Sequence, residues 1–110
     1  MAITSNVKQT IALTGDGLAQ KYVGASATTI TKARIMSVYG QATAADAEIK
    51  IYNEADDSKT AKHLVFHVKF SNADNHGQSF TVPGEGIYCN AGMYVDVTNC
   101  DHVTIIGTFT

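Results

Sequence analysis

Apolar and polar side chains alternate with a period of two along most of the chain, which is the pattern of half-buried β-strands. The alternation is clearest at residues 47–52 and 64–70. The second of these segments predicts a buried aromatic face and leaves His63 and His67 on the opposite face. Clusters of Gly, Asn, Asp and Ser separate the segments, as turns do. The pattern therefore predicts an all-β fold, a single antiparallel β-sandwich of jelly-roll-like type with about eight short strands over residues 1–110.

Three further features of this pattern bear on the architecture. Val7 is placed on a first strand with the apolar residues that follow it, and 87–89 with 93–97 predict a hairpin across Asn90-Ala91-Gly92. Residues 28–39 are apolar on both faces. Such a segment indicates either a bulge that shifts the alternation or a neighbouring copy that covers the outer face.

Composition supports this fold class. Val, Ile and Thr make up 31 of the 110 residues against 3 Leu, and side chains branched at Cβ favour strands over helices. Lys and Arg number 8 against 10 Asp and Glu, a net charge of −2, so no nucleic-acid partner is expected. No apolar run approaches the roughly 20 residues of a bilayer span, and no signal-peptide pattern opens the chain, so no membrane partner is expected. Synthesis in a cytoplasm is expected.

The two cysteines form no metal-type pair. The predicted hairpin would allow Cys89 and Cys100 to lie near one another and form a bridge. Two reduced, half-buried thiols are the favoured interpretation.

Candidate chemistry is sparse, and no catalytic residue, metal ligand or cofactor is predicted. His63 and His67 lie on one strand face roughly 13 Å apart, too far to hold one metal ion unaided. Asp96 and Asp101 are a pair of carboxylates that folding could bring together. Two oxygen-rich loops, 56–58 and 72–75, lack the spacing of a calcium loop. Tyr52 and Tyr94 fall on outer faces by alternation, where they could stack on a sugar or pack across strands.

The C-terminal stretch from residue 83 reads PGEGIYCNAGMYVDVTNCDHVTI. This glycine turn, Gly-Ile strand, Tyr-Val strand, Thr-Asn-X-Asp turn and Val-Thr final strand resemble the closing segment of small β-rich structural virion proteins of tailed bacteriophages, including cyanobacterial phages. The resemblance covers 28 of 110 residues, from 83 to 110. Cys89 and Cys100 depart from it, since other residues are expected at both positions.

The resemblance implies a non-enzymatic structural protein of the virus particle, a capsid decoration or cement protein on the outer capsid surface. Its partners would be the major capsid protein, other virion proteins and further copies of itself, a trimer being one plausible form. The contact surface is expected on the outer faces of 28–39 and of the terminal strands. The candidate interface residues are Ile30, Ile35, Tyr39, Tyr52 and Tyr94.

Two other functions remain open from the residues alone. A receptor- or carbohydrate-binding module of the tail or head fibre would use the tyrosines and polar loops. A small jelly-roll enzyme or metal protein would depend on His63 and His67.

Overall fold

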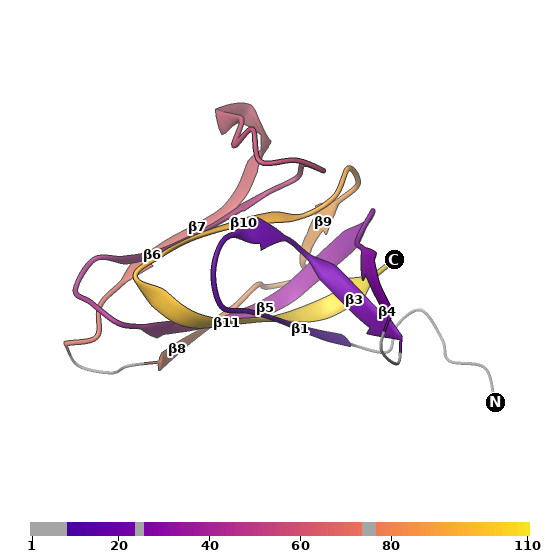
Figure 1. Ribbon diagram of the computed structural model, residues 1–110. Helices are drawn as coiled ribbons and strands as arrows, with labels where there is room; N and C mark the ends of the chain where they lie inside the picture. The colour runs from indigo at the N-terminus through magenta and orange to yellow at the C-terminus, as the bar shows by residue number, and fades with distance from the viewer. Residues whose placement is uncertain (1–8, 24–25, 74–76) are drawn as a thin grey trace.

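The computed structural model describes residues 9–23, 26–73 and 77–110. Two sheets pack face to face in a sandwich, and every paired strand within them is antiparallel (Figure 1). The strands are β1 (Gln9–Leu13), β2 (Gly17–Leu18), β3 (Gln20–Val23), β4 (Ser26–Thr29), β5 (Ala33–Ala42), β6 (Ala47–Tyr52), β7 (Leu64–Phe70), β8 (Gly77–Thr81), β9 (Ile87–Cys89), β10 (Tyr94–Thr98) and β11 (Cys100–Phe109), with a 3-10 turn η1 (Ala61–His63) before β7. The predicted all-β antiparallel sandwich is confirmed.

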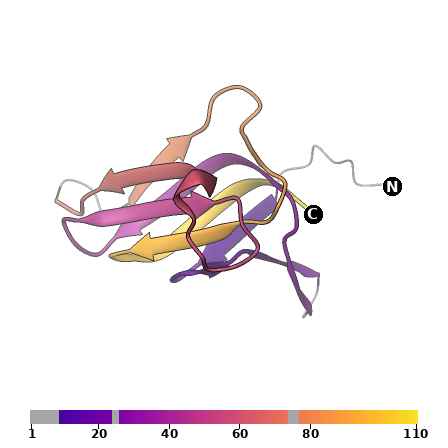
Figure 2. The same ribbon diagram turned by 90° about the horizontal axis from the view of Figure 1, so that it is seen from above.

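Sheet A has the order β1-β11-β5-β8, and the short strand β9 pairs with β5 beside the end of β8. Sheet B has the order β2-β10-β6-β7. Seen from above, β7, β6 and β10 lie side by side over the strands of sheet A (Figure 2). A separate hairpin of β3 and β4 projects from one end. The described part of the chain has eleven strands rather than about eight, partly because the segment predicted at 18–23 is divided between β2 and β3.

The core lies between the two sheets and is built from alternate side chains of each. Sheet A contributes Ile35, Val38, Val103 and Ile105, and sheet B contributes Ile49, Ile51 and Val95, all fully buried. In β7, Phe70 is buried while His67 is exposed, as the alternation predicted. Burial of branched side chains on one face of each sheet is what stabilises the two layers against one another.

A bulge interrupts the pairing of the two longest strands, β5 and β11. Ile106 pairs with Ser37 and Gly107 pairs with Ile35, so Met36 has no partner position on β11. The extra residue shifts the alternation, and Ile35 before it and Val38 after it both point into the core. The predicted bulge is confirmed, and it accounts for the apolar character on both faces without a covering copy.

The predicted hairpin between residues 87–89 and 93–97 is wrong. β9 pairs with β5 in sheet A, whereas β10 pairs with β6 and β2 in sheet B. The connection between them therefore crosses from one layer to the other, and Cys89 and Met93, on either side of it, are both fully buried. Asn53 holds this connection, because its side-chain amide donates to Asn90 Oδ1 at 2.9 Å and its Oδ1 accepts from the Ala91 N–H at 2.8 Å.

A second crossing returns the chain to sheet A at Asn99, between β10 and β11. Asn99 has φ +54°, a left-handed conformation that asparagine tolerates better than most residues. Its carbonyl accepts from the Thr43 N–H at 2.8 Å, and its side-chain amide donates to the Asp46 carbonyl at 3.1 Å. The last turn, predicted over residues 98–102, is therefore a corner between the sheets at Asn99, and β11 already begins at Cys100.

Two predictions fall partly outside the residues that the structure describes. Val7 of the predicted first strand and residues 74 and 75 of the predicted oxygen-rich loop 72–75 are not among them.

Candidate interaction surface

The outer face of sheet A differs from the rest of the described surface in having few charged and several aromatic or hydroxyl-bearing side chains. We define it as the side chains that point away from the core on its strands: Ala12, Arg34, Ser37, Tyr39, Gln41, Ser79, Thr81, Tyr88, His102, Thr104, Ile106 and Thr108. Arg34, near one end, is the only one of these side chains that carries a charge with histidine neutral. The rest are hydroxyl, amide, aromatic or aliphatic groups. Depletion of charge together with Tyr and Arg is the composition found at the centre of protein–protein interfaces.

Among the side chains whose burial the structure describes (residues 11–20, 26–73 and 77–110), the exposed large hydrophobic ones are two, and both belong to this face. Tyr88 on β9 is 53% exposed and Tyr39 on β5 is 36% exposed. Arg34 pairs with Tyr88 across the strands, so the two aromatic positions are five residues apart along β5, roughly 15 Å. The face therefore has an aromatic side chain toward each end and small hydroxyl-bearing residues between them.

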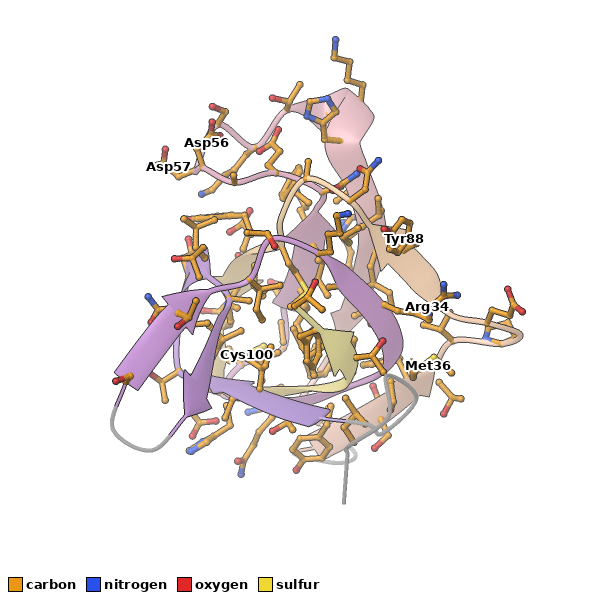
Figure 3. The ribbon with its side chains drawn as sticks, turned by 90° about the vertical axis from the view of Figure 1, so that its right-hand side faces the viewer. Arg34, Met36, Asp56, Asp57, Tyr88 and Cys100 are labelled. Carbon is orange, nitrogen blue, oxygen red and sulfur yellow. The ribbon has the colours of Figure 1, made fainter. Side chains whose placement is uncertain are left out.

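At the first end, Arg34 is held over the ring of Tyr88. Its guanidinium carbon lies 5.6 Å from the ring centroid, within the range of a cation–π contact. Arg34 Nη1 also donates to the Glu85 carbonyl at 3.1 Å, and the exposed Glu85 carboxylate lies 3.9 Å away. Figure 3 shows Arg34 beside Tyr88, with Met36 next along the same side of the molecule (Figure 3). A preordered Tyr–Arg pair loses little side-chain entropy when a partner binds.

At the second end, Tyr39 lies between Thr104 of β11 and Ser79 of β8. Its phenol ring lies over Gly77, where a Cβ atom would overlap the ring. The absence of a side chain at Gly77 is therefore what lets Tyr39 lie flat along the sheet edge.

The outer face of sheet B has the opposite character, because it carries charges that are already paired. Glu48 contacts His67 and lies 3.7 Å from Lys50, while Lys59 lies 3.5 Å from Asp16 and 3.7 Å from Asp96. The hydrogen bond from His67 lowers the pKa of Glu48, and Asp96, followed by Asp16, raises the pKa of Lys59. Exposed, mutually neutralised ion pairs are typical of a surface that stays in water.

Loop 53–60 covers one end of sheet B and is organised by a buried acid, Glu54, which sequence reasoning did not single out. Its carboxylate accepts from the N–H groups of Lys59 and Thr60 at 3.0 and 2.8 Å and contacts His63 Nδ1 at 3.0 Å. The hydrogen bonds with Thr60 are the main cause that lowers the pKa of Glu54. No sequence signal distinguishes it from the exposed Asp56 and Asp57 beside it, which Figure 3 shows at the tip of the loop.

Of the five predicted interface residues, only Tyr39 is exposed. Ile30 and Ile35 are fully buried, and Tyr52 and Tyr94 are 6% and 8% exposed. The expectation that these four side chains are exposed is wrong, and we do not retain them as interface residues. Ile30 and Ile35 lie in the core, whereas Tyr52 and Tyr94 lie on the outer side of sheet B, as alternation predicted, but are covered.

The physical reason differs for each of these positions. The bulge at Met36 turns Ile35 inward, and Ile30 leaves β4 with its N–H donated to the Ala19 carbonyl at 3.0 Å, which directs the chain into the core. Tyr94 is covered by the folded loop, whose Lys59 ammonium lies 5.9 Å from its ring centroid. Tyr52 is the direct cross-strand neighbour of Tyr94. Burial raises the pKa of the Tyr94 phenol.

Tyr88 is an interface candidate that sequence reasoning did not single out. It follows Ile87 and precedes Cys89, which is fully buried. Alternation alone would have placed Tyr88 opposite that cysteine and therefore outside.

The predicted chemical candidates are not brought together. His63 and His67 contact different carboxylates, those of Glu54 and Glu48. Asp96 pairs with Lys59, whereas Asp101 lies 3.7 Å from His102. Within residues 9–23, 26–73 and 77–110, no three His, Cys, Asp or Glu side chains converge as metal ligands would.

The two cysteines are free and far apart. Cys89 pairs with Ala33 and Cys100 with Ala42, at opposite ends of β5 and so about 30 Å apart. A disulfide needs Cα atoms within about 7 Å. The two thiols are not bridged, as the favoured interpretation has it, but only Cys100 is half-buried, because Cys89 is fully buried.

A scan against protein-family models finds no match to this chain, and a search of curated proteins finds none either. The described residues include no helix with the length and apolar character of a membrane span.

Proposed function

We propose that this protein is a non-enzymatic structural component of a tailed-phage particle, a capsid decoration or cement protein that binds its neighbours through the outer face of sheet A. The observation that carries the proposal is the placement of two exposed aromatic side chains, Tyr39 and Tyr88, on one face whose defining side chains include a single charged group, Arg34. Exposed carboxylates of Glu85 and Asp101 lie at its two ends. The sequence resemblance from residue 83 onward adds the virion setting. Its partners would be the major capsid protein, other virion proteins and further copies of the chain.

The contrast between the two faces supports an orientation. The paired charges of sheet B and the exposed carboxylates of loop 53–60 suit contact with water. The outer face of sheet A has few charges to desolvate, so little free energy is lost when a protein surface covers it. A rigid two-layer domain with one weakly charged face is suited to binding a neighbouring protein through that face.

Quantitative mass spectrometry of purified particles tests this proposal. We expect the chain at a fixed copy number relative to the major shell protein, and a lower copy number when Tyr88 and Arg34 are both changed to Ala. His67→Ala on the outer face of sheet B is the control and is expected to leave the copy number unchanged. Recovery of the chain from infected-cell lysate but never from particles would refute the proposal.

A carbohydrate- or receptor-binding module of the tail or head fibre is a second candidate. Its sugar-stacking residue would be Tyr88, whose ring is exposed, rather than Tyr52 or Tyr94, which are buried. Sugars stack on exposed aromatic faces. A glycan screen with purified protein discriminates the two functions, because binding that is lost in Tyr88→Ala and retained in Tyr52→Phe would favour the sugar-binding module.

A further inference from the structure

We propose that a second copy of this chain binds the outer face of sheet A, so that two sandwiches pair face to face about a two-fold axis. The inference deepens the proposed function, since it names one partner of the same surface. It requires only the free protein, and its test is therefore independent of the particle.

The first argument is the symmetry of the face. Its midpoint is the paired position of Ser37 and Ile106, with Arg34 and Tyr88 on one side along the strands and Tyr39 on the other. Consider a two-fold axis that lies between the facing sheets of two copies and runs perpendicular to the strands at this midpoint. It places the Arg34 and Tyr88 end of one copy over the Tyr39 end of the other. Isologous pairing requires this property, that one patch complements itself.

Specific contacts follow from that axis. β8 and β9 lie on the same side of β5, opposite its two halves. Exchange of the ends therefore places Tyr88 of one copy over Ser79 and Tyr39 of the other. The guanidinium of Arg34 then meets the aromatic end of the second copy, where a second cation–π contact is available.

The second argument is charge. The chain has a net charge of −2, so two copies repel weakly overall. Arg34 is the only formal charge among the side chains that define this face with histidine neutral, and the exposed carboxylate of Asp101 lies beside His102 at the opposite end. An axis parallel to the strands along β5 would stack Arg34 on its own copy, and like charges in contact cost several kcal/mol at an interface. The axis across the strands instead separates the two guanidinium groups by about 20 Å. Pairing through sheet B would bury the charged side chains of Glu48, Lys50 and Lys69, whose removal from water costs more than that of neutral groups.

The third argument is area. The five strands of sheet A together hold 33 residues, and at about 3.3 Å along a strand and 4.8 Å between strands they make a face of about 500 Å² per copy. Two copies would bury about 1,000 Å² in total, which is the size that a specific interface needs.

Sedimentation equilibrium of the purified full chain tests the pairing. We expect a species of twice the 11.7 kDa chain mass. Thr104→Lys adds a charge beside Tyr39 on the outer face of sheet A and should weaken association at least tenfold. Thr98→Lys makes the same change on the outer face of sheet B, and there association should be unchanged. Circular dichroism of both variants confirms that they fold.

Cysteine cross-linking provides a second measurement that does not depend on a destabilising change. In a Cys100→Ser background, Ile106→Cys lies next to the proposed axis and should give a disulfide-linked dimer under mild oxidation. Lys50→Cys, on the outer face of sheet B, is the matched control and should remain monomeric. Cys89 is fully buried and does not take part.

A monomer at all concentrations overturns the inference, as does a trimer, or a dimer that Thr98→Lys dissociates and Thr104→Lys does not. These outcomes leave the particle copy number untouched, because the capsid protein would then be the partner of this face. Conversely, a dimer in solution with no copies on particles would refute the proposed function alone.

Discussion

Gly92 is the residue at which the crossing between the two sheets is most sensitive to substitution. It has φ +126°, a conformation that residues with a side chain rarely adopt. A Cβ atom placed there would lie 2.7 Å from the Glu54 carbonyl oxygen and 3.1 Å from the Ala55 Cα. Both neighbours are backbone atoms of loop 53–60, so the overlap cannot be relieved by rotating a side chain.

The expected cost of Gly92→Ala combines these two effects. Backbone strain at an unfavourable φ is worth about 1–3 kcal/mol, and forced repacking adds about 1–3 kcal/mol. We therefore expect the free energy of unfolding to fall by about 4 kcal/mol. At about 4 °C per kcal/mol for a domain of this size, the melting temperature should fall by about 15 °C.

Two other glycines separate the contributions. Gly84 has φ +68° but open space around its Cα, so Gly84→Ala should cost only the strain of about 1 kcal/mol. Gly15 has neither constraint, and Gly15→Ala should be neutral or slightly stabilising. Urea denaturation followed by circular dichroism measures all three. If Gly92→Ala costs no more than Gly84→Ala, the close approach of the loop does not hold the crossing.

Three further predictions concern the loop, the thiols and the core. Because hydrogen bonds lower the pKa of Glu54 below its ordinary 4.5, its contribution to stability is present above that pH and is lost as pH falls through the lowered value. Glu54→Gln should therefore destabilise the protein in urea at pH 7 much more than at pH 3, and equal losses at both would contradict this. Burial raises the pKa of Cys89 to about 11, so a thiol reagent at pH 8 should titrate one thiol, Cys100, in the native protein and two in denaturant. Ile35→Ala should cost about 2–5 kcal/mol by denaturation, whereas Ser79→Ala on the exposed side of the same sheet should change stability by about 0.5 kcal/mol or less. A small effect at Ile35 would mean that this side chain is not in the core.

The strand content was predictable because alternation is a local property. In β6 and in the second half of β7, apolar and polar side chains alternate, so a core between two layers follows from the order of residues. The bulge near Met36 was also visible, since the apolar positions change parity within one continuous strand.

The partner of each strand was not predictable in the same way. The Asn90-Ala91-Gly92 segment has the composition of a tight hairpin turn, yet β9 and β10 belong to different sheets. The different sheets of β9 and β10 are decided by the burial of Cys89 and Met93 on either side of the turn and by two hydrogen bonds that involve Asn53. Asn53 is 37 residues away from Asn90 in sequence. Contacts of that separation leave no periodic trace in the chain.

The order of residues thus determined that this chain forms strands and which side chains alternate. Tertiary structure alone decided which outer faces remain exposed. Four tyrosines on outer faces have the same side chain but different exposure: Tyr39 and Tyr88 are exposed, and Tyr52 and Tyr94 are buried. Loop 53–60, held in place by Glu54 and Lys59, covers Tyr94 and leaves sheet A uncovered. Exposure depends on what packs above a residue, and here that cover comes from a distant segment of the chain.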